Sequence, residues 1–403
     1  MNENLPEGWK IIDLSEAVFF QEGPGIRKWQ FTTEGIKLIN VGNIVNGSLN
    51  LDKTDRHCSN DEVEEKYSHF LLEENDIIMA TSGVTWGKTA IVKKQHLPLM
   101  LNTSVIRFRS LDKNILSRGY LLLFLNSIYF KKQIERLITG GCQPNFGPSH
   151  LKKVKMILPP LETQNKIVEI LENAEKLKEW RTEADELANN YLNALFLDIF
   201  SNYWEKSEKD LNDHVFFQEG PGIRKWQFTT EGIKLINVRN IVNGELKLDN
   251  TDRHCSNDEV EERYSHFLLE ENDIVMATSG VTWGKTAIVE KQHLPLMLNT
   301  SVIRFRSLDE SFLCRNYLFY FLNSVYFKKQ IERLITGGCQ PNFGPYHLKK
   351  IKMMIPPIEK QKRFSEIVDI IETLKTHQAQ SKQEIDNLFN TLMQKAFKGE
   401  LVC

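Results

Sequence analysis

The sequence predicts a mixed α/β (α+β) protein, built as two nearly identical globular domains that are separated by two long helices. Three observations predict this class: an internal repeat over most of the chain, β-rich runs bounded by Gly, Asn and Pro in each copy, and a heptad pattern after each copy. With 403 residues, of which 41% are hydrophobic, the chain is long enough to bury the cores of two or more domains.

The internal repeat is the strongest of these observations. The run Val18–Gly25 recurs as Val215–Gly222, at an offset of 197 residues, and the same offset leads without a gap to Pro159-Pro160 and Pro356-Pro357. Roughly nine in ten residues of the two copies are identical. Because this period is too long for a solenoid unit, each copy is expected to be a whole domain. We expect domains at 1–160 and 201–357, with helical connectors at 161–200 and 358–403.

Each copy contains the elements of an α/β domain. Ile36–Val41, Asp76–Thr81 and Leu99–Arg109 are β-rich runs with turn residues at their ends. Ser59–Glu62 has the pattern of a capping box that opens a short helix. A longer helix is predicted over Tyr120–Ile138, ahead of two glycines.

Heptad patterns follow both copies. Adding 197 maps one apolar series onto the other, so each helix is expected to bury its narrow stripe against the other helix. The alternative is two unrelated amphipathic helices that pack on their own domains. The first series is Ile167, Ile170, Ala174, Leu177, Ala184, Ala188, Tyr191 and Leu195, interrupted by Arg181. The second is Phe364, Ile367, Ile371, Leu374, Ile385, Leu388 and Leu392, interrupted by Gln378 and Ser381.

Composition and charge narrow the class of protein. The net charge is -2, so any binding to nucleic acid must come from local basic patches rather than from a global attraction. No apolar run approaches the roughly 20 residues that span a bilayer, and the first ten residues lack the basic and apolar regions of a signal peptide. The six cysteines form no CxxC pair. We therefore expect a cytoplasmic protein with reduced thiols and no contact with a membrane.

Motifs of catalysis and cofactor binding are missing from the sequence. Gly83–Thr89 has three residues between its glycines, whereas a phosphate-binding P-loop has four. His57-Cys58 and its copy have no second pair of ligands for a metal ion. Gln143–Phe146 is not the asparagine-proline-proline-aromatic motif of an adenine methyltransferase. We therefore expect a protein that binds rather than catalyses, with no catalytic residues, cofactor or metal.

Four turns in each copy combine basic, amide and aromatic side chains. This mixture suits DNA, because Arg and Lys contact phosphates or guanine, Asn and Gln contact adenine, and apolar groups contact the thymine methyl. For any single turn the alternative is a solvated loop or a core tryptophan. The candidate residues of the first copy are Arg27, Lys28, Trp29, Gln30, Asn43, Thr85, Trp86, Lys88, Gln143 and Asn145. Those of the second are Arg224, Lys225, Trp226, Gln227, Asn240, Thr282, Trp283, Lys285, Gln340 and Asn342.

The order of several short motifs resembles that of the DNA-specificity subunits of type I restriction-modification systems. The motifs are Leu5–Trp9, Gly83–Lys88, Gln143–Asn145, Leu158–Gln164 and Gln394–Leu401. The resemblance implies two target recognition domains, held apart by an antiparallel coiled coil with pseudo-two-fold symmetry. It further implies double-stranded DNA, two adenine methyltransferase subunits and restriction (translocase) subunits as partners, with S-adenosylmethionine and ATP bound by those partners.

The near identity of the two copies departs from the resemblance, since members of that family commonly carry dissimilar recognition domains. Two identical readers predict a bipartite, palindromic target. The copies differ beside the candidate turns at Gly42 against Arg239, where Arg239 is expected to add a phosphate contact, and at Ser149 against Tyr346. The rival interpretations are a coiled-coil interaction scaffold with two ligand-binding heads and a nucleic-acid enzyme whose active site has no recognisable motif.

Overall fold

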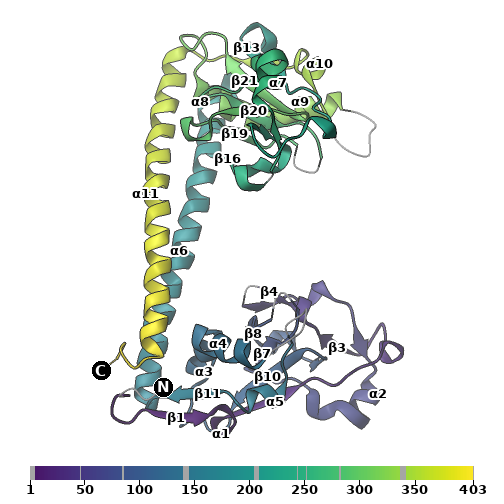
Figure 1. Cartoon of the computed structure of the whole chain (residues 1–403), viewed down its shortest axis with the longest axis vertical. Coiled ribbons are helices and arrows are strands. Elements are labelled where there is room, and N and C mark those ends of the chain that lie inside the picture. The colour runs from purple at the N-terminus through teal and green to yellow at the C-terminus, as the bar shows by residue number, and fades with distance from the viewer. Residues whose placement is uncertain are drawn as a thin grey trace. The chain divides into compact units, whose positions relative to one another are not determined.

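The computed structural model divides the chain into two compact units. Unit 1 comprises Met1–Arg181 and Gln380–Cys403, and unit 2 comprises Thr182–Ala379. Each unit holds one globular domain and one half of each of two long helices, α6 (Leu161–Phe200) and α11 (Ile358–Ala396) (Figure 1). The structure describes residues 5–45, 47–83, 86–138, 145–203, 208–242, 244–250, 252–280, 283–335 and 342–402. No helix in these ranges is long and apolar enough to cross a membrane.

The first domain is built on a four-stranded antiparallel sheet, in the order β2-β10-β7-β8. The domain also contains a three-stranded sheet, β6-β3-β9, and two two-stranded sheets, β1-β11 and β4-β5. The strands are β1 (Lys10–Asp13), β2 (Val18–Glu22), β3 (Ile36–Ile39), β4 (Ile44–Val45), β5 (Ser48–Leu49), β6 (His57–Cys58), β7 (Ile77–Ala80), β8 (Thr89–Ile91), β9 (Leu99–Leu101), β10 (Val105–Ser110) and β11 (Lys155–Leu158). The helices are α1 (Leu14–Ala17), α2 (Asn60–Glu62), α3 (Arg118–Asn126), α4 (Ile128–Leu137) and α5 (Pro148–Leu151).

The second domain repeats this topology, as the near identity of sequence requires. Its sheets have the orders β13-β21-β18-β19, β17-β14-β20, β12-β22 and β15-β16. The strands are β12 (Glu208–Asp210), β13 (Val215–Glu219), β14 (Ile233–Ile236), β15 (Ile241–Val242), β16 (Glu245–Leu246), β17 (His254–Cys255), β18 (Ile274–Ala277), β19 (Thr286–Ile288), β20 (Leu296–Leu298), β21 (Val302–Ser307) and β22 (Lys352–Met354). The helices are α7 (Asn257–Glu259), α8 (Arg315–Asn323), α9 (Val325–Leu334) and α10 (Pro345–Leu348). The mixed α/β class is confirmed.

Two of the predicted elements are each split by a single serine. The run Leu99–Arg109 becomes β9 and β10 because Ser104 lies between them in the left-handed region, with φ of 65°. The helix predicted over Tyr120–Ile138 becomes α3 and α4. Ser127 ends α3 and caps α4, since its hydroxyl donates to the Phe124 carbonyl and accepts the Phe130 N–H. The short helix predicted after Ser59 is confirmed as α2.

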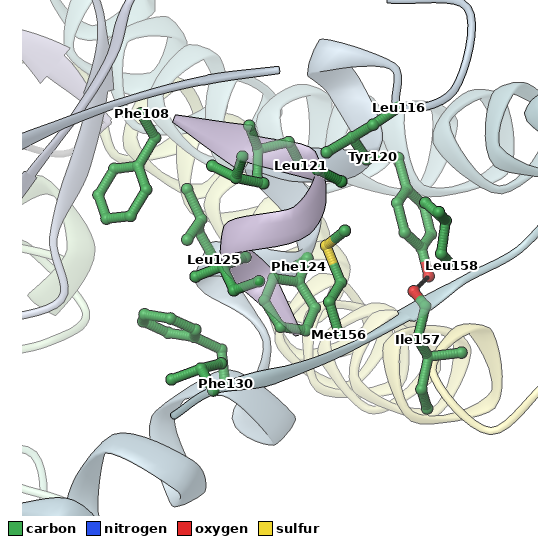
Figure 2. Close-up of a cluster of buried hydrophobic side chains, with 14 of the residues drawn as sticks. Phe108, Leu116, Tyr120, Leu121, Phe124, Leu125, Phe130, Met156, Ile157 and Leu158 are labelled. Atoms are coloured by element: carbon green, nitrogen blue, oxygen red, sulfur yellow. Dashed lines mark hydrogen bonds between the residues drawn. The ribbon is translucent and has the colours of Figure 1, made fainter. Parts of the chain in front are cut away.

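The core of the first domain joins the sheet to α3, α4 and the long helices. Aromatic and aliphatic side chains interlock there, and the Tyr120 hydroxyl points at the Ile157 carbonyl, to which it donates a hydrogen bond of 2.8 Å (Figure 2). Burial raises the pKa of this phenol. Because the hydroxyl has a partner, the ring is buried without leaving a polar atom unsatisfied.

A buried glutamine attaches each long helix to its domain. Gln164 accepts the Ser117 N–H at 2.9 Å and donates to the carbonyls of Ile115 and Pro159. Gln361 makes the equivalent bonds to Cys314, Phe312 and Pro356. Both N–H groups and the oxygen of each amide are thus hydrogen-bonded at the helix starts, which fixes the direction in which each helix leaves its domain.

Opposite halves of the two long helices lie side by side in each unit. In unit 1, Lys178 of α6 forms an ion pair of 3.2 Å with Asp386 of α11 and lies over the Phe389 ring. In unit 2, the Phe196 and Phe200 rings of α6 pack on Phe364 of α11, with centroids 5.6 and 5.5 Å apart. The start of α6 therefore pairs with the end of α11, and the reverse, as an antiparallel pair requires.

The buried seam of these helices agrees with the predicted one at Ile167, Ala174 and Phe364 and differs from it at other positions. In α6, Leu171 and Leu192 are buried although the predicted seam did not include them. Leu177 and Tyr191, which the predicted seam did include, are 41% and 53% exposed. In α11, Val368 is buried and Leu374 is 45% exposed. The prediction is wrong at these positions. Each domain packs against the ends of the helices, and this packing determines which helix residues are buried. Leu177, Trp180, Leu187 and Tyr191 are left exposed on α6, and we call them the outer stripe.

Candidate nucleic-acid interface

Three of the four candidate turns line one cavity in the first domain. The cavity has a volume of about 570 Å³. Its walls come from the turn at Gly25–Phe31, the turn at Asn40–Gly42, Ser82, and the backbone that joins β9 to β10. The fourth turn reaches the same place, because Asn145 forms a β-bridge with Ser82 and the Phe146 N–H donates to the Thr81 carbonyl at 3.2 Å. The four turns of one domain therefore converge.

Interior amides hold the second turn in shape. Asn43 is fully buried; it accepts the Asn40 N–H at 2.9 Å, and its own amide donates to the Asn50 carbonyl. Asn102 donates to the Asn40 side chain at 2.7 Å and so joins this turn to the turn between β9 and β10. Gly23 completes the junction, since a Cβ there would lie 2.3 Å from the Asn102 carbonyl oxygen.

Gln30 performs the same structural task in the first turn. It accepts the Arg27 N–H at 2.9 Å, and its amide donates to Glu62 and to the Tyr67 hydroxyl. Gln227 and Asn240 repeat these bonds in the second domain. The structure therefore places these four candidate amides in the interior, where they shape the turns.

The remaining candidates present charged and aromatic groups to the solvent. Trp29 is 78% exposed and Trp226 75% exposed, which is unusual for the largest apolar side chain. The other exposed candidates are Arg27, Lys28, Lys88 and Asn145, with the copies Arg224, Lys225, Lys285 and Asn342. Thr85, Gln143, Thr282 and Gln340 lie outside the described residues.

Trp86 and Trp283 anchor the third turn rather than project from it. The Trp86 ring meets the buried Phe146 edge-on, with centroids 5.9 Å apart, and Trp283 meets Phe343 at the same distance. Each tryptophan also packs against the main core of its domain. The third and fourth turns are thereby held together by an aromatic pair.

Two cationic residues of the interface were missed by the sequence analysis. Arg56 lines the cavity, with its guanidinium 5.1 Å from the centre of the Phe31 ring; Arg253 and Phe228 form the same pair in the second domain. Lys131 of α4 approaches Gly87, where a Cβ would lie 3.8 Å from its Cε. Strand pairing and helix packing bring them to the site, so their spacing in the sequence carried no signal.

The two domains differ at the rim of this interface. Arg239 replaces Gly42, which lines the cavity in the first domain. Tyr346 replaces Ser149; its exposed ring lies under the Lys350 ammonium, which also donates to its hydroxyl at 2.8 Å. That hydrogen bond lowers the pKa of the Tyr346 phenol. The second interface therefore carries additional cationic and aromatic surface.

The His57-Cys58 pair has a structural setting. Cys58 is buried, and its thiol donates to Glu62 at 3.6 Å. Burial, followed by the nearby Glu62 charge, raises the pKa of the thiol. Within the described ranges, no three His, Cys, Asp or Glu side chains are grouped so that they could hold a metal ion.

Comparison with known proteins identifies the family. The model of the type I restriction modification DNA specificity domain matches residues 6–187 and 210–387. The chain belongs to this family. Its two matched regions are the two repeats, each extended into its long helix. This places the chain among the non-catalytic specificity subunits rather than the methyltransferase or restriction subunits.

Several specificity subunits are similar over most of their length. The type I restriction enzyme MjaVIII specificity subunit of Methanocaldococcus jannaschii is 25% identical over 352 residues, which cover 82% of this chain and 80% of that protein. The EcoKI specificity subunit of Escherichia coli K12 is 21% identical, with 98% and 90% covered. A chain from a structural study of the assembly and conformational transition of the type I restriction-modification system has a TM-score of 0.64 at 17% identity. That match covers 99% of this chain and 100% of the other.

Proposed function

We propose that each domain of this specificity subunit reads one half of a bipartite site in double-stranded DNA through its four converging turns. The observation that carries the proposal is the convergence, at one cavity, of four turns that carry exposed cations, an exposed tryptophan and an exposed amide. Both domains offer these groups, so one chain supplies two readers.

The side chains of the interface divide into two roles. Arg27, Lys28 and Lys88 are exposed cations suited to phosphate oxygens, which position a protein on DNA without reading its sequence. Asn145 and Trp29 offer an amide and a ring to base edges. The interior amides described above act indirectly, because they fix the turns from which these groups project.

Methyl transfer and cleavage then belong to partner subunits. The long helices offer a surface for them, because the outer stripe leaves four large apolar side chains in water on α6. Exposed apolar surface of this kind marks a site of protein contact. We assign the outer stripe to adenine methyltransferase subunits, of which two are expected, and place restriction subunits on the resulting complex.

Competition binding with the reconstituted methyltransferase complex tests DNA reading. A duplex selected from a random library should compete far better than a scrambled duplex of equal length, and the affinity for both should fall as salt rises. The rival scaffold with two ligand-binding heads predicts no preference between the duplexes and no regular salt dependence. Equal competition at every salt concentration would therefore refute sequence reading.

A further inference from the structure

Glu22 and its copy Glu219 are carboxylates close to the four turns of each interface. Glu22 ends β2 on the face that carries Val18 and Phe20, which pack on the domain core. Its side chain is half-buried, and its carboxylate accepts the backbone N–H of Ser104. Glu219 accepts the N–H of Ser301 in the same way.

The carboxylate lies between the cavity and the fourth turn. Ser104 lines the cavity, and a Cβ on Gly147, just after Asn145 and Phe146, would lie 3.2 Å from Glu22 Oε2. The equivalent distance from Gly344 to Glu219 is also 3.2 Å. Each carboxylate therefore lies beside the fourth turn and beside the serine that precedes β10 or β21.

Among the described residues, no cation forms an ion pair with either carboxylate, although Arg27 and Arg56 line the same cavity as Ser104. Burial is the main effect on both groups and raises their pKa. An ionised carboxylate offers about four acceptor positions, of which the serine N–H occupies one. Against DNA, a carboxylate is repelled by phosphates, so its remaining positions are favourably filled only by donors on a base edge.

We propose that Glu22 and Glu219 each accept a hydrogen bond from the exocyclic amino group of one base in the major groove, either cytosine N4 or adenine N6. They thereby determine which base is tolerated at one position of each half-site. The inference rests on the proposed DNA-reading function and adds a specificity-determining residue to each reader.

Base analogues test the contact with the wild-type protein in its methyltransferase complex. Exocyclic amino groups are removed from the target one at a time, with 2-pyrimidinone for cytosine and purine for adenine, and binding is measured. One position in each half-site should lose about five- to a hundredfold in affinity, the range expected for one base contact. Which analogue causes the loss distinguishes cytosine from adenine.

Removing an amino group also removes a hydrogen bond between the two bases of a pair. The variant Glu22→Gln distinguishes the loss of the protein contact from this loss of base pairing. Gln keeps an oxygen that can accept the Ser104 N–H, but it presents an N–H donor where the second carboxylate oxygen was. Removing the exocyclic amino group should therefore no longer lower the affinity of the variant for DNA. The loss should occur in one half-site only, and Glu219→Gln should affect the other. Glu74→Gln is the matched control, because Glu74 is exposed and precedes β7, whereas the interface follows that strand.

Three results would overturn the inference. One is a wild-type complex that prefers its target but has no position sensitive to the amino group. Another is an identical penalty in wild type and Glu22→Gln. The third is a fall in thermal stability of Glu22→Gln with equal loss on every duplex, which would make Glu22 a support for the Ser104 turn alone. A wild-type complex without any sequence preference would instead refute both this inference and the proposed function.

Discussion

Lys88 and Lys285 are exposed beside turns that Trp86 and Trp283 hold against the core. Substituting both lysines with Ala should weaken binding to every duplex and reduce the logarithmic salt slope by about two, since each phosphate contact contributes about 0.9. Filter binding between low and physiological salt measures this. Lys94→Ala with Lys291→Ala is the control, because these exposed lysines follow β8 and β19 at the opposite end. An unchanged slope would remove Lys88 and Lys285 from the phosphate contacts.

Arg239 gives the second domain a cation that the first domain lacks, because the first domain has Gly42 at this position. Its backbone carbonyl accepts the Asn250 amide at 2.9 Å, and on Gly42 a Cβ would meet only Thr54 Cγ2, at 3.7 Å, so either domain has room for either residue. Arg239→Gly should lower affinity and reduce the salt slope by about one, while Gly42→Arg should do the opposite. The double exchange should restore wild-type affinity. A change in the bases selected by either variant would contradict a role in phosphate binding.

Helices α3 and α6 approach each other at Gly119, where a Cβ would lie 2.9 Å from Val168 Cγ1. In unit 2 the corresponding residues are Asn316 and Ser365, and Asn316 donates to Asp369 at 3.1 Å. Gly119→Asn should therefore destabilise unit 1 by about 1–3 kcal/mol through overpacking. Thermal unfolding measures this, and Val168→Ser should recover part of the loss. No recovery in the double variant would show that the clash is not with Val168.

The observed burial of the long helices predicts that some residues affect the stability of the protein and others affect its assembly with methyltransferase subunits. Ile371 packs against the core of unit 2, so Ile371→Asp should lower the thermal midpoint by leaving a charge in apolar surroundings. Leu177 of the outer stripe is 41% exposed, so Leu177→Asp should leave the midpoint unchanged while weakening methyltransferase binding in a pull-down or titration. Equal loss of stability in both variants would instead favour the seam predicted from the sequence.

At the scale of the whole molecule, duplication predicts the symmetry of the target. Two nearly identical readers on an antiparallel helix pair should meet the same bases on opposite strands, so the half-sites should be inverted copies around an unread spacer. Their centres should lie about 10 base pairs apart, one helical turn, for both readers to approach from one side. Mapping methylated adenines after reconstitution decides this, with one adenine expected per half-site on each strand. Unrelated half-sites or a direct repeat would contradict the symmetric arrangement.

The sequence alone determined the duplication, the α/β class, the two long helices and the family. These features are carried by identity at a fixed offset and by local periodicity, neither of which depends on how the chain folds back on itself. It also located the four turns, because each is a contiguous run. It identified only part of the buried seam of the long helices. A shift of one residue rotates a side chain by about 100° around the helix axis, and packing against the domain decides which residues are buried.

Only the tertiary structure decided which polar residues of those turns are available to a ligand. Asn and Gln side chains can form hydrogen bonds with backbone groups or with base edges, so residue type does not show which they do. Asn43 and Gln30 are buried and support the turns, whereas Asn145 is exposed. The pairing of Ser82 with Asn145 and the approach of Arg56 to Phe31 join residues far apart in sequence. Such contacts form only when the sheets assemble, which is why the convergence of the turns and the position of Glu22 were not visible in the sequence.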